Sequence, residues 1–281
     1  EAEAPLPRPQ AAVKVWGGRG PGATKATASA YGLAGPCVTV GLASGEVLIL
    51  DAGTGIRECS QMLLATPQVT GATLLLSHYH AAHIEGLQGL PLLAKPGFPL
   101  KVMGPMDPEL NLADFCRGLG AKAALSPFIM EEQEYHLSDE VVLRVSYMNH
   151  PTTTLGYSIE AAGRKIVYCP DAELPADGEV EVGNAMDRLR QFVLGADVLL
   201  FDSHFAPEDL AAGRGEGHSA WPAVTRLASQ GGVRRLVLFH VSARYSDAQV
   251  GAMETAARRA LADAASSIDC QTGKDGLTIQ L

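Results

Sequence analysis

Three histidines, His78, His80 and His83, stand within six consecutive residues, directly after the apolar run 73–76. Such a run predicts a buried strand, and the end of a strand is a rigid place from which a loop can present several imidazoles to one ion. We expect His78 and His80 to reach one metal from an extended turn. His83 begins a helical pattern and is expected to point to a second metal position.

Four further strand-like runs also end in a residue type that binds metals, and these residues are His150, Asp171, Asp202 and His240. One strand that ends in such a residue is common, whereas five in one chain are not. Neutral imidazoles and carboxylates at this density suit zinc first, with manganese or iron as alternatives. The sequence therefore predicts a centre of one or two metal ions per chain.

Together these motifs resemble the metallo-β-lactamase-fold hydrolases, whose pattern is H-x-H-x-D-H followed by a distant His, Asp and His. Four segments, 13–20, 48–55, 149–157 and 217–219, resemble more narrowly the cyclic-nucleotide phosphodiesterase-like and ribonuclease Z-like branch. The family pattern implies six metal ligands. Three would hold a first ion, two would hold a second ion, and one carboxylate would bridge them: His78, His80 and His150; His83 and His240; and Asp171.

One position departs from this pattern, because the chain has Ala82 where the family has an aspartate. In the family that carboxylate binds the second metal and is well placed to accept a proton from the metal-bound water. A methyl group does neither, so we expect a weaker second site and an impaired or altered activity. Two interpretations stay open: a natural divergence, or a substitution made to trap an inactive enzyme.

Four other polar residues are expected to support the centre rather than bind metal. Asp51 and Asp202 are predicted to hold neighbouring side chains, with a helix N-cap as a second role for Asp51. The resemblance implies that His218, in Gly217-His218-Ser219, protonates the leaving group, and the alternative is a loop hydrogen bond. His204 is predicted to lie at the surface or behind the ligands, and the alternatives are an auxiliary ligand or a substrate contact.

Alternating strand and helix patterns along the chain predict an α/β protein, and the resemblance implies a four-layer αββα sandwich of two mixed β-sheets flanked by helices. One helix is predicted near 84–93, and another over 246–264, where apolar residues at helical spacing form one buried stripe. We expect one domain over residues 11–281. Residues 1–10, which begin Glu-Ala-Glu-Ala, are interpreted as disordered or as the remnant of a secretion leader from the expression system. The segment 105–135, interrupted by proline and glycine, is expected to form a lid or a substrate wall.

Composition limits the partners that we expect. The net charge of −9 disfavours nucleic acid as a bulk partner, and no apolar run is long enough to span a membrane. Five scattered cysteines without a C-x-x-C motif predict reduced, mostly buried thiols and a cytoplasmic location. We expect a small anionic ester as substrate, and a homodimer as a possible assembly.

The predicted reaction is metal-assisted hydrolysis, in which the ion makes hydroxide available near neutral pH. A phosphodiester is the expected substrate, because the segments specific to the branch point there. Two alternatives stay open. One is a lactonase or thioesterase on the same scaffold, since a fold does not determine which bond is cleaved. The other is a non-catalytic protein that binds a metal or a ligand.

Overall fold

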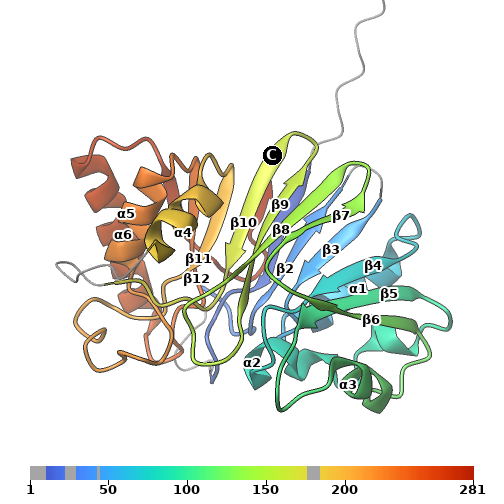
Figure 1. Ribbon diagram of the computed structural model, residues 1–281. Helices are drawn as coiled ribbons and strands as arrows, with labels where there is room; N and C mark the ends of the chain where they lie inside the picture. The colour runs from blue at the N-terminus through green and yellow to red at the C-terminus, as the bar shows by residue number, and fades with distance from the viewer. Residues whose placement is uncertain (1–10, 23–29, 43–44, 176–183) are drawn as a thin grey trace, which may run out of the picture.

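The structure is a computed structural model that describes residues 11–22, 30–42, 45–175 and 184–281. The segment 1–10, predicted to be disordered or vector-derived, lies outside the described residues. Figure 1 shows two β-sheets packed face to face, with helices on the outer side of each. The predicted four-layer sandwich of two mixed sheets is confirmed.

The first sheet has seven strands in the order β14-β1-β2-β3-β4-β5-β6. Pairing is antiparallel from β14 to β3 and parallel from β3 to β6. The strands are β1 (Ala12–Gly17), β2 (Cys37–Gly41), β3 (Val47–Leu50), β4 (Ala72–Leu75), β5 (Pro99–Pro105), β6 (Ala124–Met130) and β14 (Thr278–Gln280).

The second sheet has the order β13-β12-β11-β10-β9-β8-β7 and the same division into antiparallel and parallel halves. The central parallel strands β11 and β12 are largely apolar, because parallel strands inside a sheet are covered on both faces. The strands are β7 (Glu134–Ser138), β8 (Val141–Tyr147), β9 (Leu155–Ala161), β10 (Arg164–Cys169), β11 (Val198–Asp202), β12 (Arg235–Phe239) and β13 (Asp269–Thr272).

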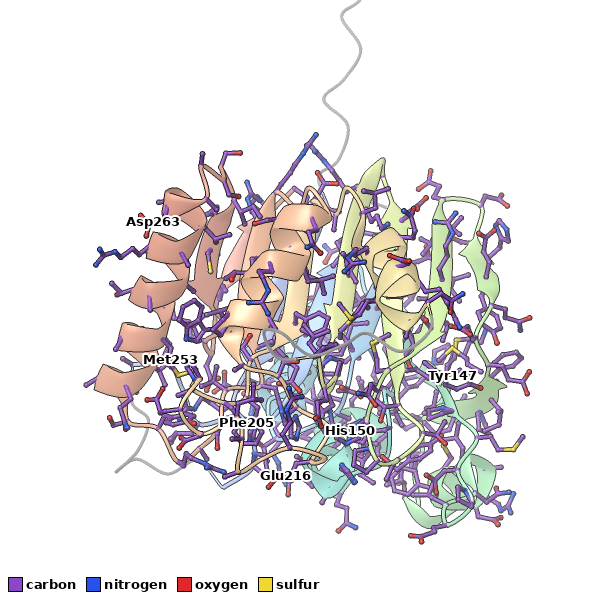
Figure 2. The ribbon with its side chains drawn as sticks, turned by 60° about the vertical axis from the view of Figure 1, so that its left-hand side comes forward. Tyr147, His150, Phe205, Glu216, Met253 and Asp263 are labelled. Atoms are coloured by element: carbon purple, nitrogen blue, oxygen red, sulfur yellow. The ribbon has the colours of Figure 1, made fainter. Side chains whose placement is uncertain are left out.

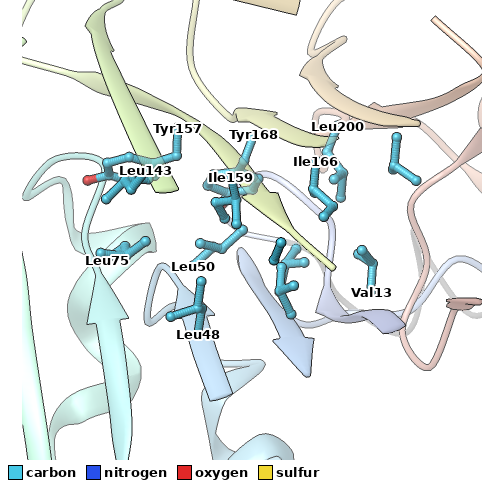
Figure 3. Close-up of a cluster of buried hydrophobic side chains, with 14 of the residues drawn as sticks. Val13, Leu48, Leu50, Leu75, Leu143, Tyr157, Ile159, Ile166, Tyr168 and Leu200 are labelled. Atoms are coloured by element: carbon cyan, nitrogen blue, oxygen red, sulfur yellow. The ribbon is translucent and has the colours of Figure 1, made fainter. Parts of the chain in front are cut away.

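The inner faces of the two sheets share one hydrophobic core, which both sheets supply with side chains from alternate strand positions. Figure 3 shows Leu48 and Leu50 of the first sheet opposite Tyr157, Ile159 and other residues of the second. This shared core favours our prediction of a single domain over residues 11–281.

Two outer layers of helices complete the sandwich. On the first sheet lie α1 (Ile56–Ala65), α2 (Ala81–Ile84), η1 (Glu85–Leu87), η2 (Pro91–Ala94) and α3 (Leu112–Gly118). On the second lie α4 (Ala185–Val193), α5 (Trp221–Gln230) and α6 (Asp247–Asp263). Helix α6 begins with a capping box between Ser246 and Gln249 and buries the apolar stripe that its sequence predicted.

One prediction about local structure was wrong. The segment 84–93, predicted as one helix, forms two short 3₁₀ turns, because Gly89 has a positive φ of 68° and Pro91 starts a new turn. The segment 105–135 supplies α3, the edge strand β6 and the start of the edge strand β7, and its role as a lid or substrate wall stays a prediction.

The strands that carry the candidate ligands all end at the same edge of the sandwich. Strand β8 runs in the same direction as β10, because each is antiparallel to β9, and β10 to β12 are mutually parallel. The carboxyl ends of parallel strands meet at one edge, which is where sites form in such folds. Across the described part of the chain, no helix combines the length and the apolar character needed to cross a membrane.

Candidate metal centre

The first group of ligand-type side chains gathers around one oxygen of Asp171. His78, His80, His150 and Asp171 bring one ligand atom each within 4.8 Å of the others. Asp171 Oδ2 lies 3.6 Å from His78 Nε2 and 3.8 Å from His150 Nε2. His80 faces this group through Nδ1, which is 3.4 Å from His150 Nε2. Figure 2 shows His150 at the edge where the strands end.

The second group forms around the other oxygen of the same carboxylate. Asp171 Oδ1 lies 3.2 Å from His83 Nε2 and 3.7 Å from His240 Nδ1. His83 sits in the short helix α2, and His240 follows β12 in a left-handed conformation with φ of 56°. A non-glycine residue in the left-handed region is strained, and at His240 this conformation directs the imidazole toward Asp171. The six residues that the sequence indicated thus converge, in the division that the family pattern implied.

Three of the imidazoles, those of His78, His83 and His150, are held by a hydrogen bond on the far ring nitrogen. Asp51 Oδ2 accepts from His83 Nδ1 at 2.8 Å, from Ser77 Oγ at 2.8 Å and from Tyr168 Oη at 2.8 Å. Because the hydroxyl proton of Ser77 is donated to Asp51, His78 Nδ1 donates to Ser77 Oγ at 3.0 Å. These bonds leave Nε2 as the ring nitrogen of His78 and of His83 that faces Asp171.

His150 is fixed in the same way by the backbone of another loop. Its Nδ1 donates to the carbonyl oxygen of Gly217 at 3.0 Å. A Cβ at Gly217 would stand 2.1 Å from His150 Nδ1, and Gly217 has φ of 84°. Both the space and the backbone therefore require glycine here, which places the loop carrying His218 against a candidate ligand.

Several polar atoms at the centre are buried and have no hydrogen-bond partner. A buried polar atom without a partner is costly, and native proteins rarely leave one so. A divalent cation would supply the missing partner for the nitrogen and oxygen atoms that face the centre, including one nitrogen of His240, so the donor set fits a metal. The atoms are His78 Nε2, His83 Nε2, Asp171 Oδ1 and both ring nitrogens of His240.

Burial and charge act on the protons of this cluster in opposite directions. Burial lowers the pKa of His78 and of His240 well below the usual value, so both rings are neutral lone-pair donors. Burial alone would also lower the pKa of His83, but the carboxylates of Asp171 and Asp51 outweigh it and raise that pKa to about 10. Burial would raise the pKa of Asp171, but the surrounding histidines hold it well below its usual range.

His218 lies beside the first group and is paired with Asp202. Its Nδ1 is 2.6 Å from Asp202 Oδ2, and its Nε2 is 3.9 Å from Asp171 Oδ2. Burial works against a charged His218, yet Asp202 outweighs it and raises the pKa of His218 to about 9. Burial raises the pKa of Asp202 to about 6. The two side chains therefore form an ion pair at neutral pH, with a proton available on His218 Nε2.

The other predicted residues are placed as follows. Asp51 and Asp202 hold imidazoles as expected, and the backbone of helix α1 shows Gly55 rather than Asp51 at its N-cap. His204 is buried against His240, which agrees with the second of its two predicted places, behind the ligands, rather than with the surface. Ala82 is a buried residue of α2, directly before His83.

Three contributors were not found from the sequence. Ser77 directly precedes the predicted ligand His78, and this neighbourhood was the one sign that its hydroxyl could take part in the centre, where it donates to Asp51. Tyr168 looked like a core residue of β10, and its hydroxyl contact with Asp51 depends on the pairing of the two sheets. The carbonyl of Gly217 carries no side-chain signal at all.

A cavity of about 780 Å³ lies beside the loops that carry His150 and Asp171. Its apolar wall includes Met148, Leu174 and Met186. Two arginines that line it are engaged in ion pairs, Arg188 with Glu132 and Arg214 with Glu173. The cavity thus offers an apolar surface with a neutralised rim next to the centre.

Comparison with known proteins agrees with this geometry. Residues 47–241 match the family model described as the beta-lactamase superfamily domain. A ribonuclease Z from Methanosarcina mazei is 28% identical over 258 residues, covering 72% of this chain and 80% of the relative.

Two solved structures share the fold along nearly the whole chain. The metallo-beta-lactamase fold protein YhfI from Bacillus subtilis has a TM-score of 0.69 and 20% identity, covering 97% of this chain and 100% of its own. Zn(2+)-bound PqqB from Methylobacterium extorquens also has a TM-score of 0.69, with 18% identity and coverage of 96% and 100%. At these identities the likeness concerns the fold.

Proposed function

Since the chain belongs to the β-lactamase superfamily and has the metallo-β-lactamase fold, we propose that it is a metal-dependent hydrolase of phosphodiesters. One observation carries the proposal. Five imidazoles converge on the two oxygens of Asp171, and the inward-facing atoms of His78, His83 and His240 are buried without a hydrogen-bond partner. Zinc suits this donor set, and the chain would bind one or two ions.

Bound ions would act as Lewis acids and make hydroxide available near neutral pH. The residues of the chain orient the reaction around them. Asp51, Ser77 and Gly217 fix the ligand rings through their far nitrogens. His218 keeps a proton on Nε2, 3.9 Å from Asp171 Oδ2, and would deliver it to the oxygen of the leaving group. Asp202 stabilises the charged form of His218 and sets its orientation.

Ala82 makes the second metal position the weaker one. The group around Asp171 Oδ2 has four candidate ligands, whereas the group around Oδ1 has three. A methyl group at position 82 offers no oxygen donor and no proton acceptor. We therefore propose full occupancy at the first position and partial occupancy at the second, with slowed turnover.

The substrate class rests on two opposing considerations. The relative from Methanosarcina mazei is named ribonuclease Z, which sits against our expectation that nucleic acid is an unlikely partner. The net charge of −9 and the paired arginines of the neighbouring cavity favour a small diester over a long polyanion. We propose a small phosphodiester and include RNA in the test. A cytoplasmic location and a homodimer stay predictions.

The proposal is tested by assaying four substrates in parallel: an aryl phosphodiester, an RNA with an extended 3′ end, a lactone and a thioester. Each is assayed with and without a chelator, followed by metal reconstitution. We expect hydrolysis of the aryl diester that the chelator abolishes and added zinc restores. Hydrolysis of the lactone or the thioester alone would instead assign a different bond to this centre.

A further inference from the structure

A third group of histidines, His204, His218 and His240, lies beside the candidate metal centre, with ligand-type nitrogens within 4.8 Å of one another. Distance alone would allow this group to hold an ion. However, an imidazole binds a metal through a lone pair that lies in the plane of its ring. The three rings are within 18° to 32° of parallel, so their lone pairs run side by side rather than toward one point.

The closest pair in this group is a stack. The ring centroids of His204 and His218 are 4.3 Å apart with an interplanar angle of 18°. Flat contact between two rings excludes water from one face of His218 and restricts rotation of its side chain. Nδ1 of His218 is already fixed by a hydrogen bond to Asp202 Oδ2 at 2.6 Å.

His204 is itself held rigidly. Its Nδ1 donates to the carbonyl oxygen of His240 at 2.9 Å, and its backbone N–H donates to Asp202 Oδ1 at 2.9 Å. Behind the ring lies Gly20, where a Cβ would stand 2.9 Å from His204 Cε1. The next residue, Phe205, donates its backbone N–H to Ser219 O at 3.0 Å, which ties the two histidine-bearing segments together.

We propose that His204 is a positioning residue for His218: its stacked ring and the carboxylate of Asp202 together hold His218 Nε2 toward the metal centre. The hydrogen bond to Asp202 lies in the plane of the His218 ring and fixes the position of Nδ1. The stacked ring of His204 fixes the tilt of that plane. The inference rests on the proposed function, because a fixed proton donor matters where a leaving group needs a proton. His204 touches neither the substrate nor the metal in this account.

Two variants separate the stack from the hydrogen bond. His204→Phe keeps an aromatic face against His218 and loses the donor to His240 O. His204→Asn keeps a donor near the position of Nδ1 and loses the aromatic face. Thermal denaturation and metal content of both variants are compared with those of the unmodified protein, so that unfolding or loss of ions is recognised.

The first readout does not need turnover. Proton NMR follows the hydrogen on His218 Nδ1, assigned by its disappearance in Asp202→Asn, and measures its exchange with solvent. We expect exchange about 2- to 10-fold faster in His204→Asn, the scale for losing an aromatic pair, and nearly unchanged exchange in His204→Phe. Unchanged exchange in a folded His204→Asn, or equal acceleration in both variants, would overturn the stacking role.

The second readout is the rate on two diesters. His204→Asn should lower kcat about 10- to 100-fold for an alkyl diester, with KM and the rate on a nitrophenyl diester little changed. His204→Phe should retain most of the alkyl rate. Equal losses on both diesters would contradict the proposal. If no variant hydrolyses any diester, the proposed function fails, and the exchange rates still decide whether His204 positions His218.

Discussion

The two halves of the candidate centre share one carboxylate but differ in composition and in surroundings. The half around Asp171 Oδ2 has four candidate ligands, one of which, His80, is exposed to solvent. The half around Oδ1 has three, and His83, Asp171 and His240 are all buried. The second half is the more deeply buried, with His83 held by Asp51, and yet it has the fewer donors, because Ala82 adds none.

The orientation of the ligands and their number are therefore separate properties of a metal site. The bond of Asp51 to His83 orients one ligand of the second half independently of position 82, and the bonds from Ser77 and Tyr168 fix the carboxylate of Asp51 itself. An intact scaffold around an incomplete donor set predicts that the second site is weak and can be restored by a single substitution.

The largest effect is expected from Asp171→Ala, because this residue belongs to both halves. Removing it deletes the shared donor and leaves five imidazoles without the carboxylate that opposes their charge. We expect loss of both ions and a fall in hydrolysis beyond the 10- to 100-fold that loss of a supporting partner costs. Elemental analysis and the diester assay measure this. Retention of one tightly bound ion would show that the halves are independent.

Ala82→Asp is the next largest change, and it acts on the second half alone. The new carboxylate would return a donor and a proton acceptor, so second-metal occupancy and turnover should both rise. Restoring one catalytic group is worth on the order of a hundredfold to ten-thousandfold. Ala82→Asn, which returns bulk without charge, is the matched control. Unchanged occupancy and rate in Ala82→Asp would mean that the site works without the carboxylate.

His218→Ala removes the proposed proton donor beside the first half, so the size of its effect depends on the leaving group of the substrate. An alkoxide needs a proton and a nitrophenolate does not, so the alkyl diester should lose about a hundredfold more rate than the nitrophenyl diester. Asp202 raises the pKa of His218 to about 9, against the effect of burial, so the acid is present below that value. The alkyl rate should fall as pH rises through about 9, and Asp202→Asn should move this fall to lower pH. Equal losses on the two diesters would leave His218 a structural role.

The smallest effect is expected from Asp51→Asn, which tests the scaffold of the second half. The amide keeps one acceptor but loses the charge that holds His83 Nδ1. Second-metal affinity should fall about 10- to 100-fold. The first position should weaken less, because Asp51 reaches its ligand His78 only through Ser77. Calorimetric titration with zinc measures both. Asp197→Asn, at a carboxylate paired with Arg164 and Arg234 away from the centre, serves as the control.

Strand ends were the part of this molecule that its sequence predicted well. His150 and His240 could be placed because each follows an apolar run of strand length, and both runs are strands of the second sheet. The order of layers and the division of ligands came from the family pattern. Local breaks were harder, since the pattern over 84–93 is helical in its apolar spacing and only Gly89 and Pro91 disrupt it.

Contacts between distant loops were beyond the sequence. The stack of His204 on His218 depends on the pairing of the segments before α5 and after β11, which leaves no periodic signal. The left-handed backbone of Asp51 and of His240 is likewise set by tertiary packing, because neither residue type demands it.

We propose that this chain holds one strong and one weak metal position around Asp171. Calorimetric titration of the metal-free protein with zinc, with elemental analysis of the zinc-loaded protein, measures both positions. We expect two binding phases, a tight one for one ion per chain and a weaker one for the second, and Ala82→Asp should strengthen only the weaker phase. Absence of any bound zinc after reconstitution, or two phases of equal affinity, would contradict this proposal.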